Sequence, residues 1–567
     1  MTSRQKIILV SLAVFFTLLS LLPTFFEIST RKQLPFQRYF TSEHNYLFDY
    51  NFYLSRIRQG MEGRFLVTEK YYNLPHPPSL FQIVYLAFGK LGGILGLTPS
   101  TVYLFARGIF GFLLLLGIIH FGRRFFEGEK LVLFFLLAAT AGSWPILVKA
   151  GPDTIGAGSF YRFATYMGWW SVIDSLQRIT IMPHILIGQL FLIAFILKFA
   201  DRKAMSFRSL LIWAVWGNLA GIIFPPTLLI VFAYFAVISA LEFLDLSSSR
   251  QKWPEKASSI KLFLKNTFSA RLLFAFSTIP SFLYMSRMFK IMPWKALVLF
   301  DIEHRTGIPY REYLMALGPV FVLGFIGLVV SLILGARKYY PAVAWITSII
   351  LLFLVFEKVP EQSPLRFTEG LIQVPLTLMS VYLLSEIGRS AFKKIILISG
   401  YAIVAMGFLV MISMVLWLTD QAVAKRYGTW KVPIRAELAY PLKDFMEAIF
   451  YLRDNTEREQ VVLSFVTAGN YIPPYAGNYV FIGHANTPDE DGKEVEVARF
   501  FKGEFEEREA EEFMEKERIS FVFYGPQEKA FGEIADLSKT YAFLEKVYGN
   551  AEIIVYRVNS ASLKTFR

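Results

Sequence analysis

Long apolar runs dominate the first three quarters of the chain. About 20 consecutive apolar residues are needed to cross the hydrocarbon core of a bilayer, and the first run of that length is 7–26. The pattern therefore predicts a polytopic α-helical membrane protein with about eleven transmembrane helices. The other expected spans are 101–121, 130–148, 184–200, 208–224, 227–245, 271–289, 313–334, 341–357, 368–388 and 395–418.

Two apolar runs need a separate decision. The run 7–26 follows Arg4 and Lys6, and no small-residue cleavage site comes after it, so we expect an uncleaved first span rather than a signal peptide. The run 79–97 is long enough to cross, but it begins after two prolines and contains Lys90 and four glycines. These features favour an interfacial helix that does not cross the membrane.

The basic residues indicate the orientation of the spans. If 79–97 does not cross, the basic clusters between spans all lie on the side of the N-terminus, whereas a crossing would place every later cluster on the opposite side. We therefore expect a multi-pass protein of the plasma (inner) membrane, with a cytoplasmic N-terminus and an extracytoplasmic C-terminal domain. The clusters are Arg4/Lys6, Arg123/Arg124/Lys130, Arg202/Lys203/Arg208, the loop 246–271, Arg337/Lys338 and Arg389/Lys393/Lys394.

The composition agrees with a membrane protein and excludes several classes. Hydrophobic residues make up 54% of the 567 residues and charged residues 18%, with a mean hydropathy of +0.44. Soluble domains carry about 25% charged residues, so a soluble enzyme is excluded. The chain has no cysteine, which excludes disulfides, thiolate metal sites and a cysteine nucleophile. The net charge of +13 fits cytoplasmic loops and does not require a nucleic-acid partner.

The charge balance changes near residue 419. Residues 1–418 hold 39 basic and 20 acidic residues, whereas residues 419–567 hold 19 basic and 25 acidic ones. We therefore expect a transmembrane module at 1–418 and a small soluble α/β domain at 419–567. In this tail the runs 460–467, 479–484, 519–525 and 552–558 have strand composition, and 503–517 has the pattern of a charged, solvated helix.

Titratable residues are concentrated on the outer side of the predicted topology. The outer segments are 27–100, 149–183, 288–312, 358–367 and the tail, and five of the six histidines lie in them or at their membrane boundary. A carrier usually places ionisable groups along a path near the bilayer midplane. The spans here contain almost none, which weakens a transporter interpretation.

The first outer segment carries the most informative pattern. Residues 42–65 join Glu43, His44 and Asp49 to an aromatic, arginine-rich amphipathic run, and a proline-rich stretch with His76 leads into the interfacial run 79–97. A carboxylate just outside the first span, followed by surface helices, resembles the type C glycosyltransferases, which use sugars linked to polyprenyl phosphate.

The resemblance implies roles for these residues. In this superfamily an Asp or Glu of the first outer loop is the catalytic base, and Asp49 matches that position best. A carboxylate can accept the proton of an attacking hydroxyl group. Glu43, His44, Tyr53 and His76 are then candidates for substrate binding. The alternative for Asp49 is a structural one, in which it caps the helix or pairs with Arg56.

Further outer residues are candidates for the lipid phosphate. Arg178 and His184 lie in 174–189, where a Pro-His pair opens a span as in prokaryotic members of the superfamily, and a helix N-terminus favours an anion. Arg366, in a short outer loop, resembles the superfamily's late-loop arginine, and its guanidinium suits a phosphate. Arg305 lies in another charged outer loop. For each of these residues, an anchoring or solvated role is the alternative.

No metal ligand set accompanies the first-loop acid. The second outer loop offers only Asp153 and Asp174, about twenty residues apart, instead of an Asp-x-Asp motif. This departure favours single-sugar transfer without a cofactor or divalent metal over oligosaccharyl transfer to asparagine.

The expected enzyme is thus an inverting hexosyl- or pentosyltransferase. It would move a sugar from a polyprenyl-phosphate donor to a glycan, lipid or protein acceptor on the extracytoplasmic face. The alternatives are a ligase or polymerase of lipid-linked glycans, and a non-enzymatic transporter or flippase of lipid-linked sugars.

Overall fold

The computed structural model describes residues 2–42, 47–149, 161–201, 204–249, 252–387, 393–428 and 440–559. The chain forms two compact units. The helical unit comprises Met1–Pro23, Phe105–Arg287 and Asp301–Leu418, and the mixed unit comprises Thr24–Leu104, Met288–Phe300 and Thr419–Arg567. The division into domains at 1–418 and 419–567 stays a prediction.

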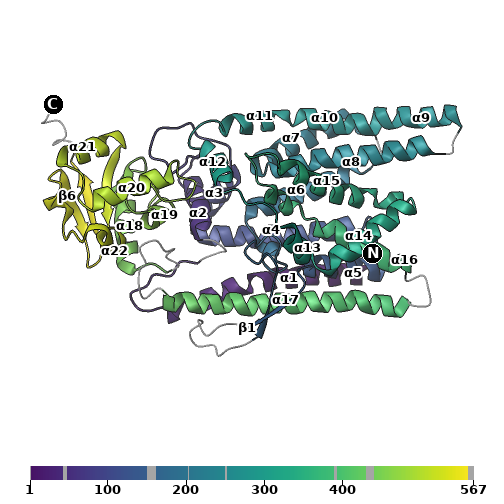
Figure 1. Cartoon of the computed structure of the whole chain (residues 1–567), viewed down its shortest axis with the longest axis horizontal. Coiled ribbons are helices and arrows are strands. Elements are labelled where there is room, and N and C mark those ends of the chain that lie inside the picture. Colours follow the sequence, from purple (N-terminus) through teal and green to yellow (C-terminus); the bar gives the residue numbers. More distant parts are fainter. Residues whose placement is uncertain are drawn as a thin grey trace. The chain divides into compact units, whose positions relative to one another are not determined.

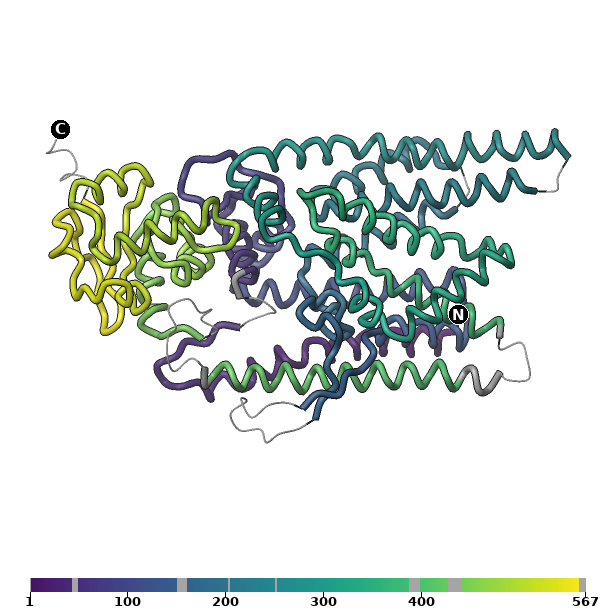
Figure 2. Tube along the Cα trace, in the orientation of Figure 1, coloured from purple at the N-terminus to yellow at the C-terminus, as the bar shows by residue number. Residues whose placement is uncertain are grey.

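The helical unit consists almost entirely of apolar helices (Figure 1). Figure 2 shows α8 running beside the long helix that continues from α9 to α11. The helices that contribute to this unit are α1 (Ser3–Ser29), α4 (Pro99–Gly122), α5 (Gly128–Thr140), α6 (Pro183–Phe199), α7 (Phe207–Ile223), α8 (Pro226–Ser248), α9 (Trp253–Phe263), α10 (Ser269–Ser277), α11 (Ile279–Met288), α13 (Tyr310–Leu317), α14 (Pro319–Ile333), α15 (Tyr340–Phe356), α16 (Gln373–Ile387) and α17 (Lys393–Gly428).

Several of these helices have the dimensions of membrane spans. Among the described residues, six helices are long and apolar enough to cross a bilayer, or up to eight if each of two bent helix pairs is one span. The bent pairs are α13 with α14, and η5 (Pro364–Gly370) with α16. Helices α6 and α7 have 17 residues each, the lower limit for a span. The chain is therefore a multi-pass membrane protein, and the number of eleven spans stays a prediction.

Two elements of the helical unit differ from the sequence prediction. The expected span 130–148 ends at Thr140, because Pro145 disfavours helix before it, and Ile146–Lys149 forms strand β1, which pairs antiparallel with β2 (Tyr161–Ala164). The expected loop 246–271 is largely helical, since α9 begins at Trp253.

Arg271, expected among the loop charges, is also placed differently. It is buried and forms an ion pair with Glu242 at 2.8 Å. Its guanidinium also donates hydrogen bonds to the carbonyl oxygen of Phe199 at the end of α6. An ionisable side chain inside a helical bundle needs such partners.

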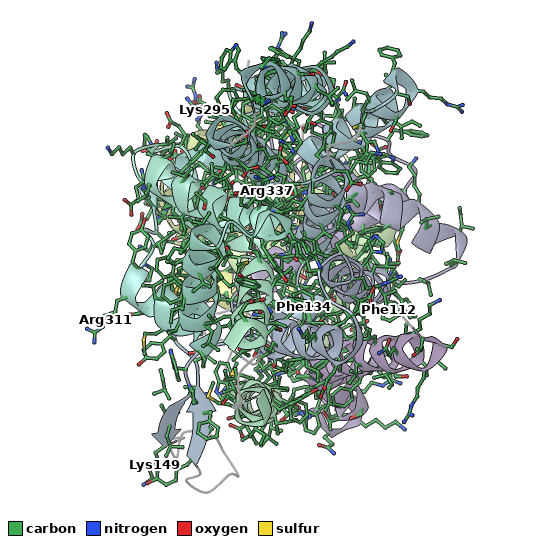
Figure 3. The ribbon with its side chains drawn as sticks, turned by 90° about the vertical axis from the view of Figure 1, so that its right-hand side faces the viewer. Phe112, Phe134, Lys149, Lys295, Arg311 and Arg337 are labelled. Atoms are coloured by element: carbon green, nitrogen blue, oxygen red, sulfur yellow. The ribbon has the colours of Figure 1, made fainter. Side chains whose placement is uncertain are left out.

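The side chains of the helical unit follow the usual division between inside and outside. Figure 3 shows Phe134 among the helices, and Lys149 and Arg311 extending outward. Phe134 has no exposed surface, whereas Lys149 and Arg311 are exposed.

The mixed unit contains the helices α2 (Leu47–Met61) and α3 (Ile83–Ile94), and their packing differs from the prediction of surface helices. Most of α2 is buried. A Cβ at Gly60 would lie 2.2 Å from the carbonyl oxygen of Leu86, and one at Gly89 1.9 Å from that of Ile57. The two helices thus touch backbone to backbone, which only glycine permits. Helix α3 has 12 residues, too few to cross a bilayer at about 1.5 Å per residue.

The predicted α/β fold of the tail is confirmed. Its five-stranded sheet has the order β4-β3-β5-β7-β6, in which β4, β3 and β5 are parallel and β7 and β6 pair antiparallel. The elements are α18 (Lys443–Asn455), β3 (Val461–Leu463), α19 (Val466–Tyr475), β4 (Tyr479–Val480), α20 (Glu490–Phe501), α21 (Glu507–Lys516), β5 (Ile519–Tyr524), α22 (Pro526–Gly532), β6 (Leu544–Gly549) and β7 (Ile554–Val558).

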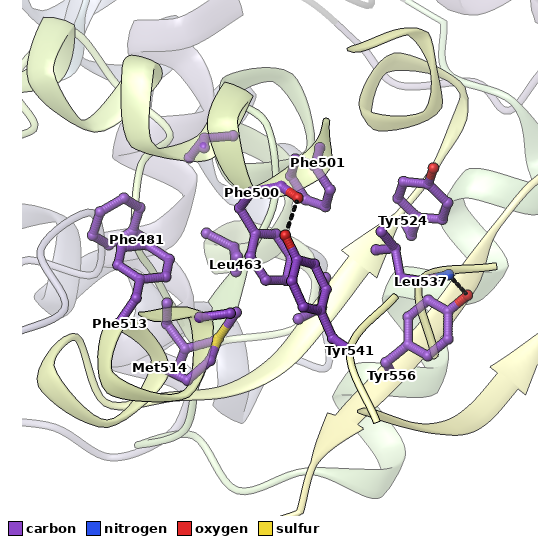
Figure 4. Close-up of a cluster of buried hydrophobic side chains, with 14 of the residues drawn as sticks. Leu463, Phe481, Phe500, Phe501, Phe513, Met514, Tyr524, Leu537, Tyr541 and Tyr556 are labelled. Atoms are coloured by element: carbon purple, nitrogen blue, oxygen red, sulfur yellow. Dashed lines mark hydrogen bonds between the residues drawn. The ribbon is translucent and has the colours of Figure 1, made fainter. Parts of the chain in front are cut away.

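An aromatic core holds this domain together (Figure 4). The Tyr541 hydroxyl donates a hydrogen bond to the carbonyl oxygen of Phe500, and the Tyr556 hydroxyl accepts one from the backbone N–H of Leu537. Buried tyrosines need such partners. The labelled core residues include Leu463, Phe481, Phe500, Phe501, Phe513, Met514, Tyr524, Leu537, Tyr541 and Tyr556.

The boundaries of the tail elements differ from those predicted. The expected strand 460–467 is shorter in the structure, because residues 466 and 467 begin α19 (Val466–Tyr475). The charged helix expected at 503–517 is confirmed by α21, which buries only Ala510, Phe513 and Met514. Strand β6 was missed, because its exposed Glu545 and Lys546 hide the strand pattern. Charged side chains are typical of edge strands.

Candidate active site

Asp49 lies in the first turn of α2 in the mixed unit. A carboxylate there interacts favourably with the positive end of the helix dipole. Its side chain is 44% exposed, while the residues that follow it in α2 are almost all buried. Asp49 is therefore an accessible carboxylate at the edge of a rigid, buried helix.

A histidine of the tail lies beside this carboxylate. The Nε2 atom of His484 is 3.4 Å from Oδ1 of Asp49, and the histidine side chain is only 2% exposed. The imidazole stacks on Phe52 with ring centroids 4.5 Å apart. The first outer segment and the tail thus supply one side chain each to the same pair.

Asn470 of α19 connects both halves of this arrangement. Its side-chain oxygen accepts a hydrogen bond from Asn51 of α2 at 2.8 Å, and its amide nitrogen donates to the carbonyl oxygen of Gly483 at 3.0 Å. The Tyr71 hydroxyl donates to its backbone oxygen. The helix that carries Asp49 and the segment that carries His484 are therefore held by one buried asparagine.

A second polar link joins the first outer segment to the tail. Lys493 donates hydrogen bonds to the side-chain oxygen of Asn73 at 2.8 Å and to the carbonyl oxygen of Phe481 at 2.9 Å. Asn73 in turn donates to Glu517. Burial lowers the pKa of Lys493 to about 8. These bonds fix the position of the proline-rich stretch that follows α2.

Arg56, the alternative partner of Asp49, is engaged elsewhere. It forms a buried ion pair with Glu69 at 2.7 Å, and its guanidinium lies over the Phe52 ring, 3.4 Å from the centroid. Buried ion pairs need such close geometry to offset the cost of desolvation. The ion pair between Asp49 and Arg56 is therefore not formed.

His76 stabilises the backbone of the segment that follows α2. Its Nε2 accepts a hydrogen bond from the backbone N–H of Glu69 at 3.0 Å, and its Nδ1 lies 2.9 Å from the carbonyl oxygen of Leu74. Burial lowers its pKa. Both ring nitrogens thus serve the backbone, and the substrate-binding role of His76 stays a prediction.

Tyr53 belongs to an aromatic cluster. Its ring stacks on Tyr85 with centroids 4.8 Å apart and faces Tyr103 at 6.2 Å, and it is 7% exposed. A sugar could reach its face only if this cluster opened.

Arg366 lies on η5 in the helical unit. Its side chain is 43% exposed, 4.0 Å from Asp301 and 3.8 Å from Glu369. Neither of these distances is a hydrogen bond. Neighbouring elements hold η5 in place, because Gln189 donates to the carbonyl oxygen of Glu369 and Trp345 to that of Gly370. Arg366 therefore combines a fixed backbone with a guanidinium that solvent can reach.

Arg178 is placed differently. It donates hydrogen bonds to the carbonyl oxygens of Ala138 and Ala139 at the end of α5, and burial lowers its pKa to about 10. It lines a cavity of about 10 Å³ together with Thr368 and Gln373. This volume suits about one water molecule and is too small for a phosphate.

Two other predicted residues of the helical unit are either buried or hydrogen-bonded to the backbone. His184, the second residue of α6, is 9% exposed and lies edge-on to Phe224. Arg305 donates to the carbonyl oxygens of Phe356 and Glu357, which end α15. Their roles in binding stay predictions. Arg305 and Arg366 are partly exposed, whereas Arg178 and His184 are buried.

Glu43, His44 and Asp153 lie outside the described residues. Within the described ranges, no three His, Asp or Glu side chains gather in a group that could hold a metal ion. Asp174 is buried and its Oδ1 accepts two backbone hydrogen bonds, from Leu176 and Gln177. The absence of a metal from the reaction stays a prediction.

Solved structures of other proteins share this architecture. ArnT from Cupriavidus metallidurans bound to undecaprenyl phosphate aligns with 99% of this chain and 99% of its own, at 11% identity and a TM-score of 0.51. The chain therefore has the fold of this ArnT structure. The fold predicted from the first outer loop is thus confirmed, and the similarity at this identity concerns the fold alone.

Two further structures align over most of this chain. The oligosaccharyltransferase AglB from Archaeoglobus fulgidus, in complex with an inhibitory peptide and a dolichol-phosphate, covers 98% of this chain and 75% of its own, at 14% identity and a TM-score of 0.49. The arabinofuranosyltransferase AftD from Mycobacteria covers 98% and 42%, at 11% identity and a TM-score of 0.45. No family model and no curated protein matches the sequence.

The residues that surround Asp49 were not predicted from the sequence. The sequence places His484 among the outer histidines but indicates no role for it, and it indicates no role for Asn51 or Asn470. One signal was present, because His484 ends a β-like run, and side chains that follow strands often line sites in α/β folds.

Proposed function

We propose that this protein is an inverting membrane glycosyltransferase that moves one sugar from a polyprenyl-phosphate donor to a hydroxyl acceptor on the extracytoplasmic face. The observation that carries the proposal is the half-exposed carboxylate of Asp49, held on a buried helix beside His484, in a chain with this fold. The undecaprenyl phosphate bound to ArnT, which shares the fold, supports the class of donor.

In this reaction the acceptor oxygen attacks the anomeric carbon of the sugar. The bond from that carbon to the phosphate oxygen breaks, and the polyprenyl phosphate leaves with the electron pair. The hydroxyl proton passes to the carboxylate of Asp49, which must lie within hydrogen-bond reach of the attacking oxygen. Arg366 stabilises the charge of the phosphate, because a guanidinium offers two parallel donors to it. A single displacement of this kind inverts the anomeric carbon.

The test is transfer of radiolabelled sugar by the purified full chain in nanodiscs, from a panel of polyprenyl-phosphate hexoses and pentoses to membrane glycan and lipid acceptors. Appearance of label in an acceptor with inverted configuration supports the proposal. Movement of the labelled lipid from one leaflet of the proteoliposome membrane to the other, without transfer of sugar to any acceptor, would favour the flippase alternative instead.

The topology is tested with cysteines, since the natural chain has none. Lys252 lies between α8 and α9, and Glu512 lies on α21 with 69% of its side chain exposed. We expect a membrane-impermeant maleimide to label Glu512→Cys in intact cells and Lys252→Cys only after lysis. Labelling of Lys252→Cys alone in intact cells would invert the topology and place the site on the cytoplasmic side.

A further inference from the structure

The hydrogen bonds of His484 define the state of its ring. Nδ1 accepts a hydrogen bond from the backbone N–H of Asn486 at 3.1 Å, so Nδ1 carries a lone pair. In a neutral imidazole the proton then lies on Nε2. That nitrogen is buried and has no hydrogen-bond partner among the described residues, and Oδ1 of Asp49 lies 3.4 Å away. The only donor of the ring is thus directed at the carboxylate.

We infer that His484 is a positioning residue for the base: its Nε2–H donates to Oδ1 of Asp49 and leaves Oδ2 to accept the proton of the acceptor hydroxyl. The inference rests on the proposed function of Asp49. The distance of 3.4 Å is longer than an ordinary hydrogen bond, but a small rotation of the half-exposed Asp49 side chain closes it. Catalytic hydrogen bonds commonly tighten when substrate binds.

The imidazole itself has little freedom to move. Phe52 stacks on one face, and the backbone N–H of His484 donates to the Thr487 hydroxyl at 3.3 Å. A Cβ at Gly469 would lie 1.8 Å from the carbonyl oxygen of Ile482, so the segment before His484 lies directly on α19. Because the donor is fixed and the acceptor side chain is half-exposed, the histidine determines where the carboxylate rests.

This arrangement gives the tail a part in the site. The carboxylate comes from the first outer segment, and its hydrogen-bond donor comes from the segment after β4. A base held by a fixed donor is already oriented when the acceptor arrives, and orientation of a reacting group lowers the barrier of the chemical step. The histidine is therefore expected to affect kcat and to leave donor binding unchanged.

Two substitutions separate this role from simple packing. The amide nitrogen of glutamine can reach the place of Nε2, whereas that of asparagine reaches only the place of Nδ1. We expect His484→Asn to lower kcat about tenfold, the effect expected for loss of one hydrogen bond to a charged group, with the donor KM within about twofold of the wild-type value. His484→Gln should recover most of the lost kcat. Equal losses in both variants, or none in either, would overturn the inference.

A spectroscopic measurement tests the contact without relying on activity. The full chain labelled with ¹⁵N-histidine has six histidines, and His484→Gln identifies the signal of interest. We expect this signal to show a proton on Nε2 and to shift in Asp49→Asn. A proton on Nδ1, or no shift, would overturn the inference even if sugar transfer is observed. Absence of transfer by the wild-type chain, with the expected signal present, would instead contradict the proposed function alone.

Discussion

Replacement of Asp49 by asparagine is expected to lower the rate of sugar transfer about a hundred- to ten-thousandfold, the usual effect of losing a positioned general base. Asparagine keeps the size of the side chain and an oxygen that can accept the Nε2–H of His484, but it cannot take a proton from the acceptor. Binding of the donor and the melting temperature should remain near wild type, because Asp49 is 44% exposed and the substitution preserves the size of the side chain. The measurement is kcat with the purified chain in nanodiscs.

Asp454→Asn is the matched control for this change. Asp454 lies on α18 in the same unit, is 56% exposed and pairs with its neighbour Arg453, so its substitution should leave transfer unchanged. Glu43→Gln tests the other carboxylate of the first outer segment and should have a milder effect. If Glu43→Gln abolishes transfer while Asp49→Asn retains it, Glu43 is the base, and normal transfer by both variants would contradict the enzyme hypothesis.

Local patterns in the sequence were sufficient to predict a multi-pass helical membrane protein, although not the number of its spans. Apolar runs of about 20 residues correspond to helices because a bilayer leaves the backbone no other way to satisfy its hydrogen bonds. The predicted helix boundaries were wrong where a local signal interrupted the apolar run, as at Pro145. They were also wrong where charged residues continued a helix beyond its apolar part, as in α9. The strands of the tail were found where their residues are mostly apolar or aromatic, and β6 was missed because it carries charged residues at the sheet edge.

The surroundings of the candidate base depended on contacts between distant parts of the chain. Asn51 and Asn470 are 419 residues apart, and no periodicity or motif indicates that they share a hydrogen bond. The amphipathic pattern of 42–65 predicted an exposed face, whereas the helix is covered by α3 and α19. A sequence can therefore indicate a carboxylate that is suited to act as a base. The hydrogen-bond donor that orients it is determined by the fold.

Replacement of Arg366 by alanine is expected to weaken binding of the donor phosphate about ten- to a hundredfold, because a hydrogen bond to a charged group contributes roughly 1.5–3 kcal/mol. Arg366→Lys keeps the charge but loses the planar fork, so its affinity should lie between those of the wild type and the alanine variant. The probe is undecaprenyl phosphate, titrated into the full chain in nanodiscs. Arg311→Ala is the matched control, since Arg311 is an exposed arginine of the same unit and should bind the lipid normally.

Removal of the negative charge of Asp301 is expected to have the opposite effect on phosphate binding by Arg366. The Asp301 carboxylate lies 4.0 Å from the Arg366 guanidinium, where it competes with a phosphate for the same positive charge. Removal of a unit charge at about 4 Å is worth about 1 kcal/mol in water, so Asp301→Asn should tighten binding of undecaprenyl phosphate about fivefold. The gain should vanish in the double variant with Arg366→Ala, because the two residues act on the phosphate through one contact. If neither single variant changes the affinity, Arg366 anchors η5 and does not bind the donor.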